Sequence, residues 1–302
     1  MAAEPLQNTA QPPGGGLPKI KALIVDGHSN HKWEITTPIL RKILEASQRF
    51  TVEVATAPQD LNELPNFKPD FAAYAVVMLN YNSDGSVLRR PDRNWGEPTQ
   101  RALEDYLKNG GALSVIHSAN NSFSGWQEYQ RMIGLGGWGH RNDKSGTYVY
   151  FQDGKLVREN GPGVGGWHGP EHAFPVVIRE PDHPITRGMP LKWMHAKDEL
   201  YSHLRGPAEN MTVLATAYSS KQMRGRDRDE PMIMTLDYGR GRVFHTALGH
   251  GDYSMRCAGF VTVVQRGTEW AATGKVTIPI PADFPGADQD RESSIFASKE
   301  AK

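Results

Sequence analysis

The chain has 302 residues, 34 basic and 34 acidic side chains, and a single cysteine, Cys257. This balanced charge argues against nucleic acid or an anionic membrane as the main partner, and no apolar run reaches the roughly 18 residues that a membrane span needs. One cysteine excludes disulfides within the chain and cysteine-based zinc sites. The cysteine count does not decide the location of the protein. A cytoplasmic protein and an exported protein whose signal peptide has been removed both stay open as interpretations.

The first half of the chain alternates predicted strands and helices. A Pro/Gly-rich tail over residues 1–18 is expected to be disordered, and Ile20–Val25 is typical of a buried strand. Thr37-Pro38 predicts a helix start, with threonine as the cap and proline at the first helical position. The following predicted elements are strands over 50–56 and 74–80, a helix over 98–108, and a strand over 112–116.

The second half is less regular. Long loop insertions are expected over residues 134–210, interrupted by a hairpin that turns at Asp153-Gly154. Strands are predicted over 211–217, from 231 onward and over 242–248, followed by a helix over 258–272. The chain is expected to form one domain over residues 19–278, with a disordered polar tail over 279–302.

This alternation predicts an α/β fold with a three-layer, doubly wound, mostly parallel sheet. Ligands of such sheets bind outside the carboxyl ends of the strands. Polar residues lie at three of those ends: Asp26 to His31, Asn80-Tyr81, and His117 to Asn121. The glycine-rich loops match no nucleotide-binding fingerprint, so no nucleotide cofactor is expected.

Three histidines follow predicted strands and are expected to meet in one crevice: His31, His117 and His250. Imidazole is both the commonest metal ligand and the side chain best suited to proton transfer near neutral pH. Two interpretations therefore stay open, a divalent metal site (zinc or manganese) and a metal-free acid–base site. His245 lies inside a strand and is expected to be a packed core residue instead.

Asp198 and Glu199 are neighbours, and adjacent side chains on a strand point to opposite faces. One can therefore face the pocket while the other caps a loop, and Asp198 is predicted to be catalytic with the three histidines. Further side chains at the same rim are predicted to bind substrate: Asn80, Tyr81, His28, Trp33, His140, Glu199 and Ser118. Because tryptophans gather in the loops, a sugar is a better candidate ligand than a lipid.

Several segments, taken in order, resemble the ThuA-like (trehalose-utilisation) family. They include "GHSNH", "GGALSVIHSA", "GWGHR", "HPITRGMP" and "EPMIMTLDYGRGRVFHTALGH", spread over roughly residues 20–275. The resemblance implies a flavodoxin-like fold similar to class I glutamine amidotransferases. In that superfamily a cysteine ends the strand that corresponds to 112–116, and His117 stands in its place. Glutamine hydrolysis through a thioester is therefore not expected.

The resemblance also implies a substrate class, because ThuA-like proteins are linked to the catabolism of disaccharides and glycosides, often beside oxidoreductases that make 3-keto sugars. A 3-keto group acidifies the C2 proton, whose removal leads to elimination or isomerisation. The leading hypothesis is therefore a carbohydrate-catabolic enzyme that acts on a glycoside or an oxidised (3-keto) sugar by histidine- or metal-assisted proton abstraction. The outcome stays open between elimination, hydrolysis and isomerisation. A non-catalytic sugar-binding module and a hydrolase using Ser118 are the alternatives, and homo-oligomerisation stays open.

Overall fold

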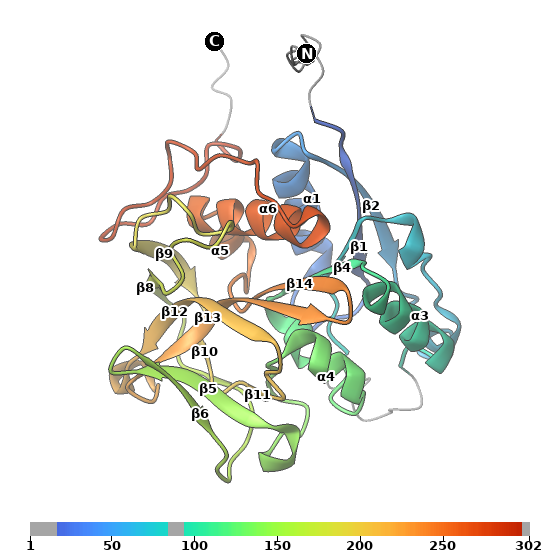
Figure 1. The fold of residues 1–302 in the computed structure, drawn as a ribbon, viewed down its shortest axis with the longest axis horizontal. Coiled ribbons are helices and arrows are strands. Elements are labelled where there is room, and N and C mark those ends of the chain that lie inside the picture. The colour runs from blue at the N-terminus through green and yellow to red at the C-terminus, as the bar shows by residue number, and fades with distance from the viewer. Residues whose placement is uncertain (1–16, 84–93, 298–302) are drawn as a thin grey trace, which may run out of the picture.

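The computed structural model describes residues 17–83 and 94–297, and this part of the chain is built around a twelve-stranded mixed sheet (Figure 1). Five neighbouring strands run parallel. In sheet order they are β2 (Phe50–Thr56), β1 (Ile20–Asp26), β3 (Val76–Leu79), β4 (Ala112–Ile116) and β14 (Gly241–Thr246). β3 and β4 are buried along their whole length, which explains their continuous apolar sequences.

The rest of the sheet is antiparallel and continues from β14. Its strands, in sheet order, are β13 (Arg228–Tyr238), β12 (Met211–Ser219), β8 (His172–Ile178) and β9 (Lys192–Asp198). The α/β class is confirmed. The sheet is more mixed than predicted, because β8 and β9 fold inside the region expected to hold loops and extend the sheet away from the parallel half.

Shorter strands complete the antiparallel region. The predicted hairpin is present as β5 (Thr147–Gln152) and β6 (Lys155–Glu159), and positive φ angles of 51° at Asp153 and 75° at Gly154 make its tight turn. β11 (Arg205–Gly206) pairs with β5. A separate two-stranded ribbon joins β7 (Trp167–His168) to β10 (Tyr201–Ser202).

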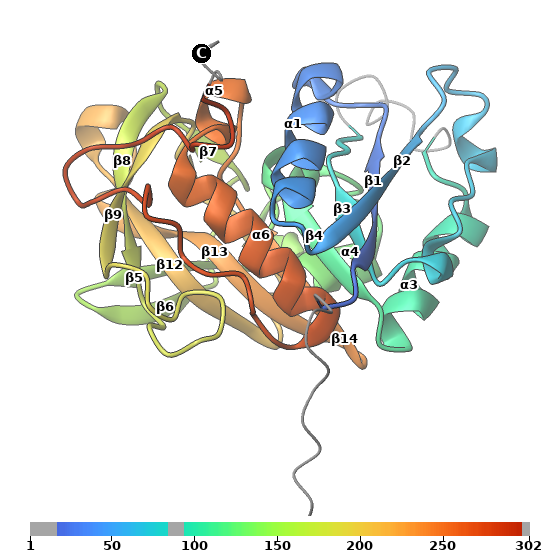
Figure 2. The same ribbon diagram turned by 90° about the horizontal axis from the view of Figure 1, so that it is seen from above.

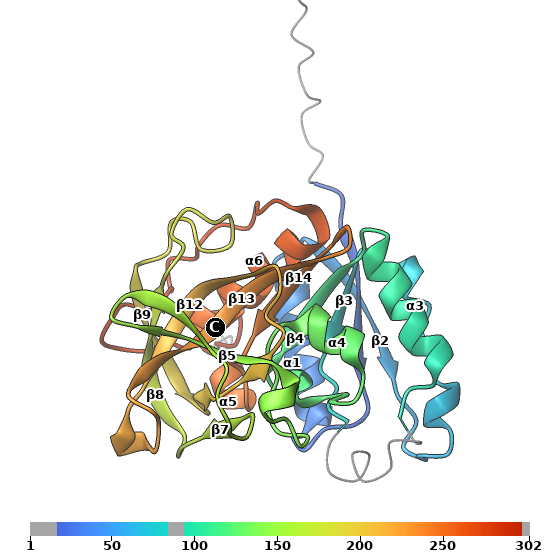
Figure 3. The same ribbon diagram turned by 60° about the horizontal axis from the view of Figure 1, so that its bottom comes forward.

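Helices cover the parallel half of the sheet. The elements are α1 (Trp33–Ala46), α3 (Glu97–Lys108), α4 (Gln127–Ile133), the short α5 (Asp252–Met255) and α6 (Ala258–Thr273). α4 lies in front of β4 in Figure 3, whereas α1 and α6 lie behind the sheet. Within the described ranges, no helix combines the length and apolar character needed to cross a bilayer.

The start of α1 differs from the prediction. The helix begins at Trp33, so Pro38 lies inside it and Thr37 is not its cap. The Thr36 and Thr37 hydroxyls instead accept hydrogen bonds from the Asn80 amide, each at 2.9 Å. Because these bonds come from a neighbouring strand end, the local Thr-Pro signal could not reveal them.

The C-terminal tail was predicted to be disordered, and this was wrong over residues 279–297. This segment runs along α6 and β9 in Figure 2. The Met194 amide donates to the Gly286 carbonyl at 2.7 Å, and Phe284 packs 5.6 Å from Trp193, ring centre to ring centre. The predicted tail over residues 1–18 lies almost entirely outside the described residues.

His245 is a core residue, as predicted. Its side chain is fully buried in β14, where Nδ1 donates to the Ile133 carbonyl at 2.9 Å and Nε2 accepts from Asn120 at 3.1 Å. Burial lowers its pKa from 6.5 to about 4. The folded protein therefore holds this imidazole neutral at a pH where the unfolded chain protonates it.

We expect the free energy of unfolding to fall as the pH drops below 6.5. His245 then binds a proton in the unfolded chain but stays neutral in the folded chain. The loss attributable to His245 between pH 7 and pH 5 is about 1–2 kcal/mol. The measurement is urea unfolding at both pH values for the wild type and His245→Gln. If the variant shows the same pH dependence as the wild type, His245 is not responsible.

Candidate metal centre

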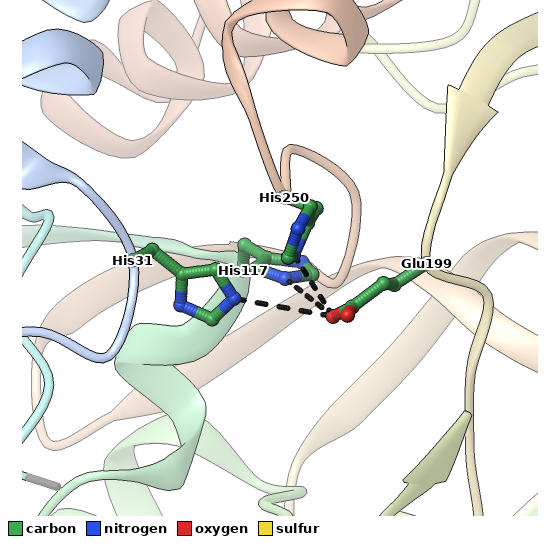
Figure 4. Close-up of side chains that lie close together, drawn as sticks. All are labelled: His31, His117, Glu199 and His250. Carbon is green, nitrogen blue, oxygen red and sulfur yellow. Dashed lines mark ion pairs between the residues drawn. The ribbon is translucent and has the colours of Figure 1, made fainter. Parts of the chain in front are cut away.

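Four side chains from separate parts of the chain converge at the carboxyl-end rim of the sheet (Figure 4). His31 follows β1, His117 follows β4, Glu199 follows β9 and His250 follows β14. Each offers one ligand atom, and these atoms all lie within 4.8 Å of one another. The three histidines predicted to meet therefore do meet.

The spacing of these atoms suits a metal ion. Glu199 Oε2 lies 3.0 Å from His250 Nδ1, 3.5 Å from His117 Nε2 and 3.9 Å from His31 Nε2. Ligands bound tetrahedrally at about 2.1 Å are about 3.4 Å apart, so small shifts would bring all four onto one ion. Three imidazoles and one carboxylate also form a donor set that zinc and manganese accept.

His117 is held in one orientation by the backbone. It is 2% exposed, and its φ of 45° lies in the left-handed region that side chains other than glycine rarely adopt. Its Nδ1 lies 2.7 Å from the Ala247 carbonyl, which can only accept, so Nδ1 carries the proton. Nε2 is buried, lacks a hydrogen-bond partner among the described residues, and points into the cluster.

Asp198 lies behind the cluster and fixes the backbone of two of its members. The carboxylate is fully buried and accepts the amides of Glu199 at 2.9 Å, Gly249 at 2.8 Å and His250 at 3.0 Å. The Asp198 carboxylate also contacts His195, whose Nε2 lies 2.7 Å from Oδ2. Glu199 faces the cluster while Asp198 holds a loop, which is the division of roles expected for adjacent carboxylates.

The charges of the cluster follow from these contacts. Burial alone would raise the pKa of Glu199, but the adjacent imidazoles of His117, His250 and His31 hold it well below its usual range. Burial and the neighbouring imidazoles lower the pKa of His31 to about 4, although Glu199 opposes that shift. The cluster therefore offers an ionised carboxylate and, at His31, a neutral imidazole, the forms that bind metals.

Three groups around the cluster were not predicted. His168, on the β7–β10 ribbon, places Nε2 3.4 Å from Glu199 Oε1, and its Nδ1 lies 2.8 Å from the Gly169 carbonyl. The Tyr201 ring lies 4.2 Å from the His117 ring, and Glu171 lies 3.3 Å from His250 Nε2. The ribbon that carries His168 and Tyr201 is only two residues long on each side, so its sequence gives no strand signal.

The predicted substrate-binding residues near the first strands have structural contacts. Asn80 holds α1 through the two threonine hydroxyls, and His28 bonds the Pro58 carbonyl at 2.7 Å. Tyr81 is 1% exposed and stacks on Phe123 with ring centres 5.6 Å apart. Trp33 is half-buried at the first residue of α1. None of these four belongs to the metal-capable cluster.

His140 and Ser118 also lie outside the cluster. His140 is exposed in the loop after α4, with a φ of 63°. Ser118 is 7% exposed, and its hydroxyl lies 3.5 Å from that of Ser29. Because no imidazole in the described structure hydrogen-bonds to this hydroxyl, the geometry does not favour Ser118 as an activated nucleophile.

A cavity of about 320 Å³ opens onto the cluster at His31 and His250. This is within the size range of pockets that hold small molecules. Its other lining residues include Asn30, Lys32, Thr36, Asp252 and Tyr253. The cluster therefore adjoins a space with mixed polar and apolar walls, the apolar part including Ile35, that is large enough for a small ligand.

The sequence profile of the ThuA family, described as trehalose utilisation, matches residues 21–271. The chain belongs to the ThuA family. It is 43% identical to a ThuA-like protein of Parabacteroides merdae, whose crystal structure it matches with a TM-score of 0.86 over 93% of this chain and 99% of that one. This confirms the family resemblance that the sequence motifs indicated.

A second solved structure shares the fold of this ThuA-family chain. The ThuA-like protein of Bacteroides uniformis is 18% identical and gives a TM-score of 0.58, over 88% of this chain and 97% of that one. Among curated proteins, none matches the chain. Family membership supports a carbohydrate-related role and assigns no reaction.

Proposed function

We propose that this ThuA-family protein is a metal-dependent enzyme that removes the proton next to the carbonyl of a keto-glycoside. The observation that carries the proposal is the cluster of His31, His117, His250 and Glu199, set beside a cavity of small-molecule size. The carbohydrate-related description of the family supports a sugar as the substrate. A divalent ion, when bound, supplies a positive charge that polarises a carbonyl oxygen.

In this proposal the four cluster residues are ligands, and His168 is the base. Its Nδ1 is occupied by the Gly169 carbonyl, which leaves the Nε2 lone pair to accept the C2 proton of a 3-keto sugar. As His168 becomes cationic, Glu199 Oε1, 3.4 Å away, stabilises the new charge. The electron pair of the broken C–H bond moves toward the carbonyl oxygen. Its return forms a C1–C2 double bond as the C1–O bond breaks, and the departing oxygen takes the proton back from the cationic His168.

Asp198, predicted from the sequence to be catalytic, is proposed here as a positioning residue. Its buried oxygens already accept three backbone amides and contact His195, so they have no access to substrate. The amides it holds are those of Glu199 and of the Gly249-His250 segment. Asp198 therefore sets the separation between the Glu199 carboxylate and the His250 ring.

Metal content tests the ligand assignment. We expect protein purified without a histidine tag to contain about one zinc or manganese per chain by elemental analysis. Chelator treatment should abolish release of the aglycone from a 3-keto-glucoside, and the same metal should restore it. His168→Gln should keep the metal and lose turnover, since it removes only the base.

Two outcomes would contradict parts of the proposal. Full turnover of a metal-free preparation would exclude the ion from the reaction. Saturable sugar binding without turnover of any keto sugar, in protein that contains metal, would favour the alternative of a non-catalytic sugar-binding module.

A further inference from the structure

A second cavity, of about 370 Å³, lies away from the candidate metal centre. It is bounded by the β5–β6 hairpin, the loop before β7 and the start of β13. Trp167 of the β7–β10 ribbon lines it, whereas the next residue, His168, faces Glu199. Because neighbouring residues of a strand point to opposite faces, the ribbon separates this cavity from the metal centre.

The cationic groups of this cavity have unused hydrogen-bond donors. Arg228 bonds Glu230 through Nε at 2.7 Å, but its Nη2 is buried and has no hydrogen-bond partner among the described residues. Arg226 is exposed and uses its Nε to donate to His203 Nε2. Nε2 of His203 can accept this bond only when the imidazole is neutral. Burial, together with Arg226 and Arg228, lowers the pKa of His203 to about 4 and so favours the neutral form.

The two acidic side chains of the cavity each have neighbours, and Glu159 makes both of its contacts through Oε2. Glu159 accepts the Tyr150 hydroxyl at 2.9 Å and lies 3.8 Å from Arg228, and Asp227 pairs with Lys221 at 2.9 Å. The buried donor of the cavity that lacks a partner among the described residues therefore belongs to a positively charged group, Arg228. Such a site favours a ligand with acceptor oxygens and negative charge, which guanidinium groups bind in pairs of hydrogen bonds.

One wall of the cavity is an accessible aromatic ring. Trp167 is 44% exposed, and its indole N–H donates to the Arg224 carbonyl at 2.9 Å, which fixes the plane of the ring. The rings of Tyr150 and Tyr148 are less available than the indole, because an arginine covers each of them. Arg228 lies 3.9 Å from the Tyr150 ring centre, and Arg205 lies 4.0 Å from the Tyr148 ring centre. The indole is therefore the surface left for the C–H face of a ligand ring.

We propose that this cavity is a second ligand site, which binds an anionic sugar: a pyranose ring that carries a carboxylate or a phosphate. Arg226 and Arg228 bind the anionic group, and Trp167 stacks on the ring. The site is separate from the metal centre and goes beyond the proposed reaction.

Isothermal titration of the full chain with four probes tests the proposal: D-glucuronate, glucose 6-phosphate, D-glucose and inorganic phosphate. We expect one or both anionic sugars to bind at least 10-fold more tightly than glucose and than phosphate alone, and their ranking separates carboxylate from phosphate as the preferred group. Arg226→Gln and Trp167→Ala should each weaken that binding at least 5-fold. Both residues are partly exposed, and thermal unfolding confirms that the variants fold.

Two further variants make the result specific. Arg101→Gln removes an exposed arginine of α3 and should leave binding unchanged. His250→Ala disrupts the metal cluster and should also leave this binding unchanged, so failure of the metal proposal cannot be mistaken for failure of this one. Equal binding of glucose, no binding of either anionic sugar, or full affinity in Arg226→Gln would overturn the proposal.

Discussion

Replacing His117 with alanine is expected to remove both the bound metal and the activity. The side chain supplies a buried Nε2 whose direction is fixed by the contact of Nδ1 with the Ala247 carbonyl, and alanine has no ligand atom to replace it. Turnover of a 3-keto-glucoside should fall at least about 100-fold, because the proposed ion that polarises the carbonyl oxygen is lost with its ligand. Metal content and kcat/KM, measured on the same preparation, check the prediction.

His183→Asn is the matched control, because His183 lies outside the cluster and packs 5.1 Å from Trp270, ring centre to ring centre. It should keep metal and activity. A His117→Ala protein that loses its metal but turns over at the wild-type rate would contradict the mechanism. If the variant keeps both metal and activity, His117 is not a ligand.

Among the variants proposed for this protein, Asp198→Ala is expected to lose the most folding stability. The change leaves three buried amides without their acceptor and removes the partner of His195. Burial alone would lower the pKa of His195, but Asp198 and Cys257 raise it to about 9, so this imidazole is cationic at neutral pH. Breaking such a buried ion pair costs about 3–5 kcal/mol, measurable by urea unfolding at pH 7.

Asp198→Asn separates charge from hydrogen bonding. The amide keeps an acceptor oxygen for the backbone, so we expect a smaller loss of stability than in the alanine variant. Metal affinity should still fall, because the Gly249-His250 segment is held less firmly; a 10- to 100-fold loss is typical for groups that orient a metal ligand. If Asp198→Ala unfolds at the same urea concentration as the wild type, the positioning role is wrong.

The convergence of the three histidines was predictable because each follows a strand of the parallel half. His31, His117 and His250 come after β1, β4 and β14, which are buried and continuous enough to recognise from sequence. Parallel strands end at a common edge, so the histidines had to lie near one another. The same reasoning identified His245 as a core residue, since it lies inside β14.

The fourth member of the cluster, Glu199, was predicted to bind substrate and was not predicted to be a metal ligand, for a physical reason. Glu199 follows β9, an antiparallel strand at the far edge of the sheet, and the rule for parallel strands does not locate its end. Its position depends on the pairing of β8 with β12 and on the bonds from Asp198 to the Gly249-His250 segment. Such long-range contacts leave no local pattern in the sequence, and the same holds for His168 on its two-residue strand.

β14 is the strand at which the two halves of the sheet join, because it pairs parallel with β4 and antiparallel with β13. His31 and His117 follow the parallel half, Glu199 follows the antiparallel half, and His250 follows β14 itself. A slip of one residue in either pairing would displace one group of donors relative to the other by about 3.3 Å. If the cluster binds a metal ion as proposed, metal occupancy reports whether the two halves have assembled in their native alignment.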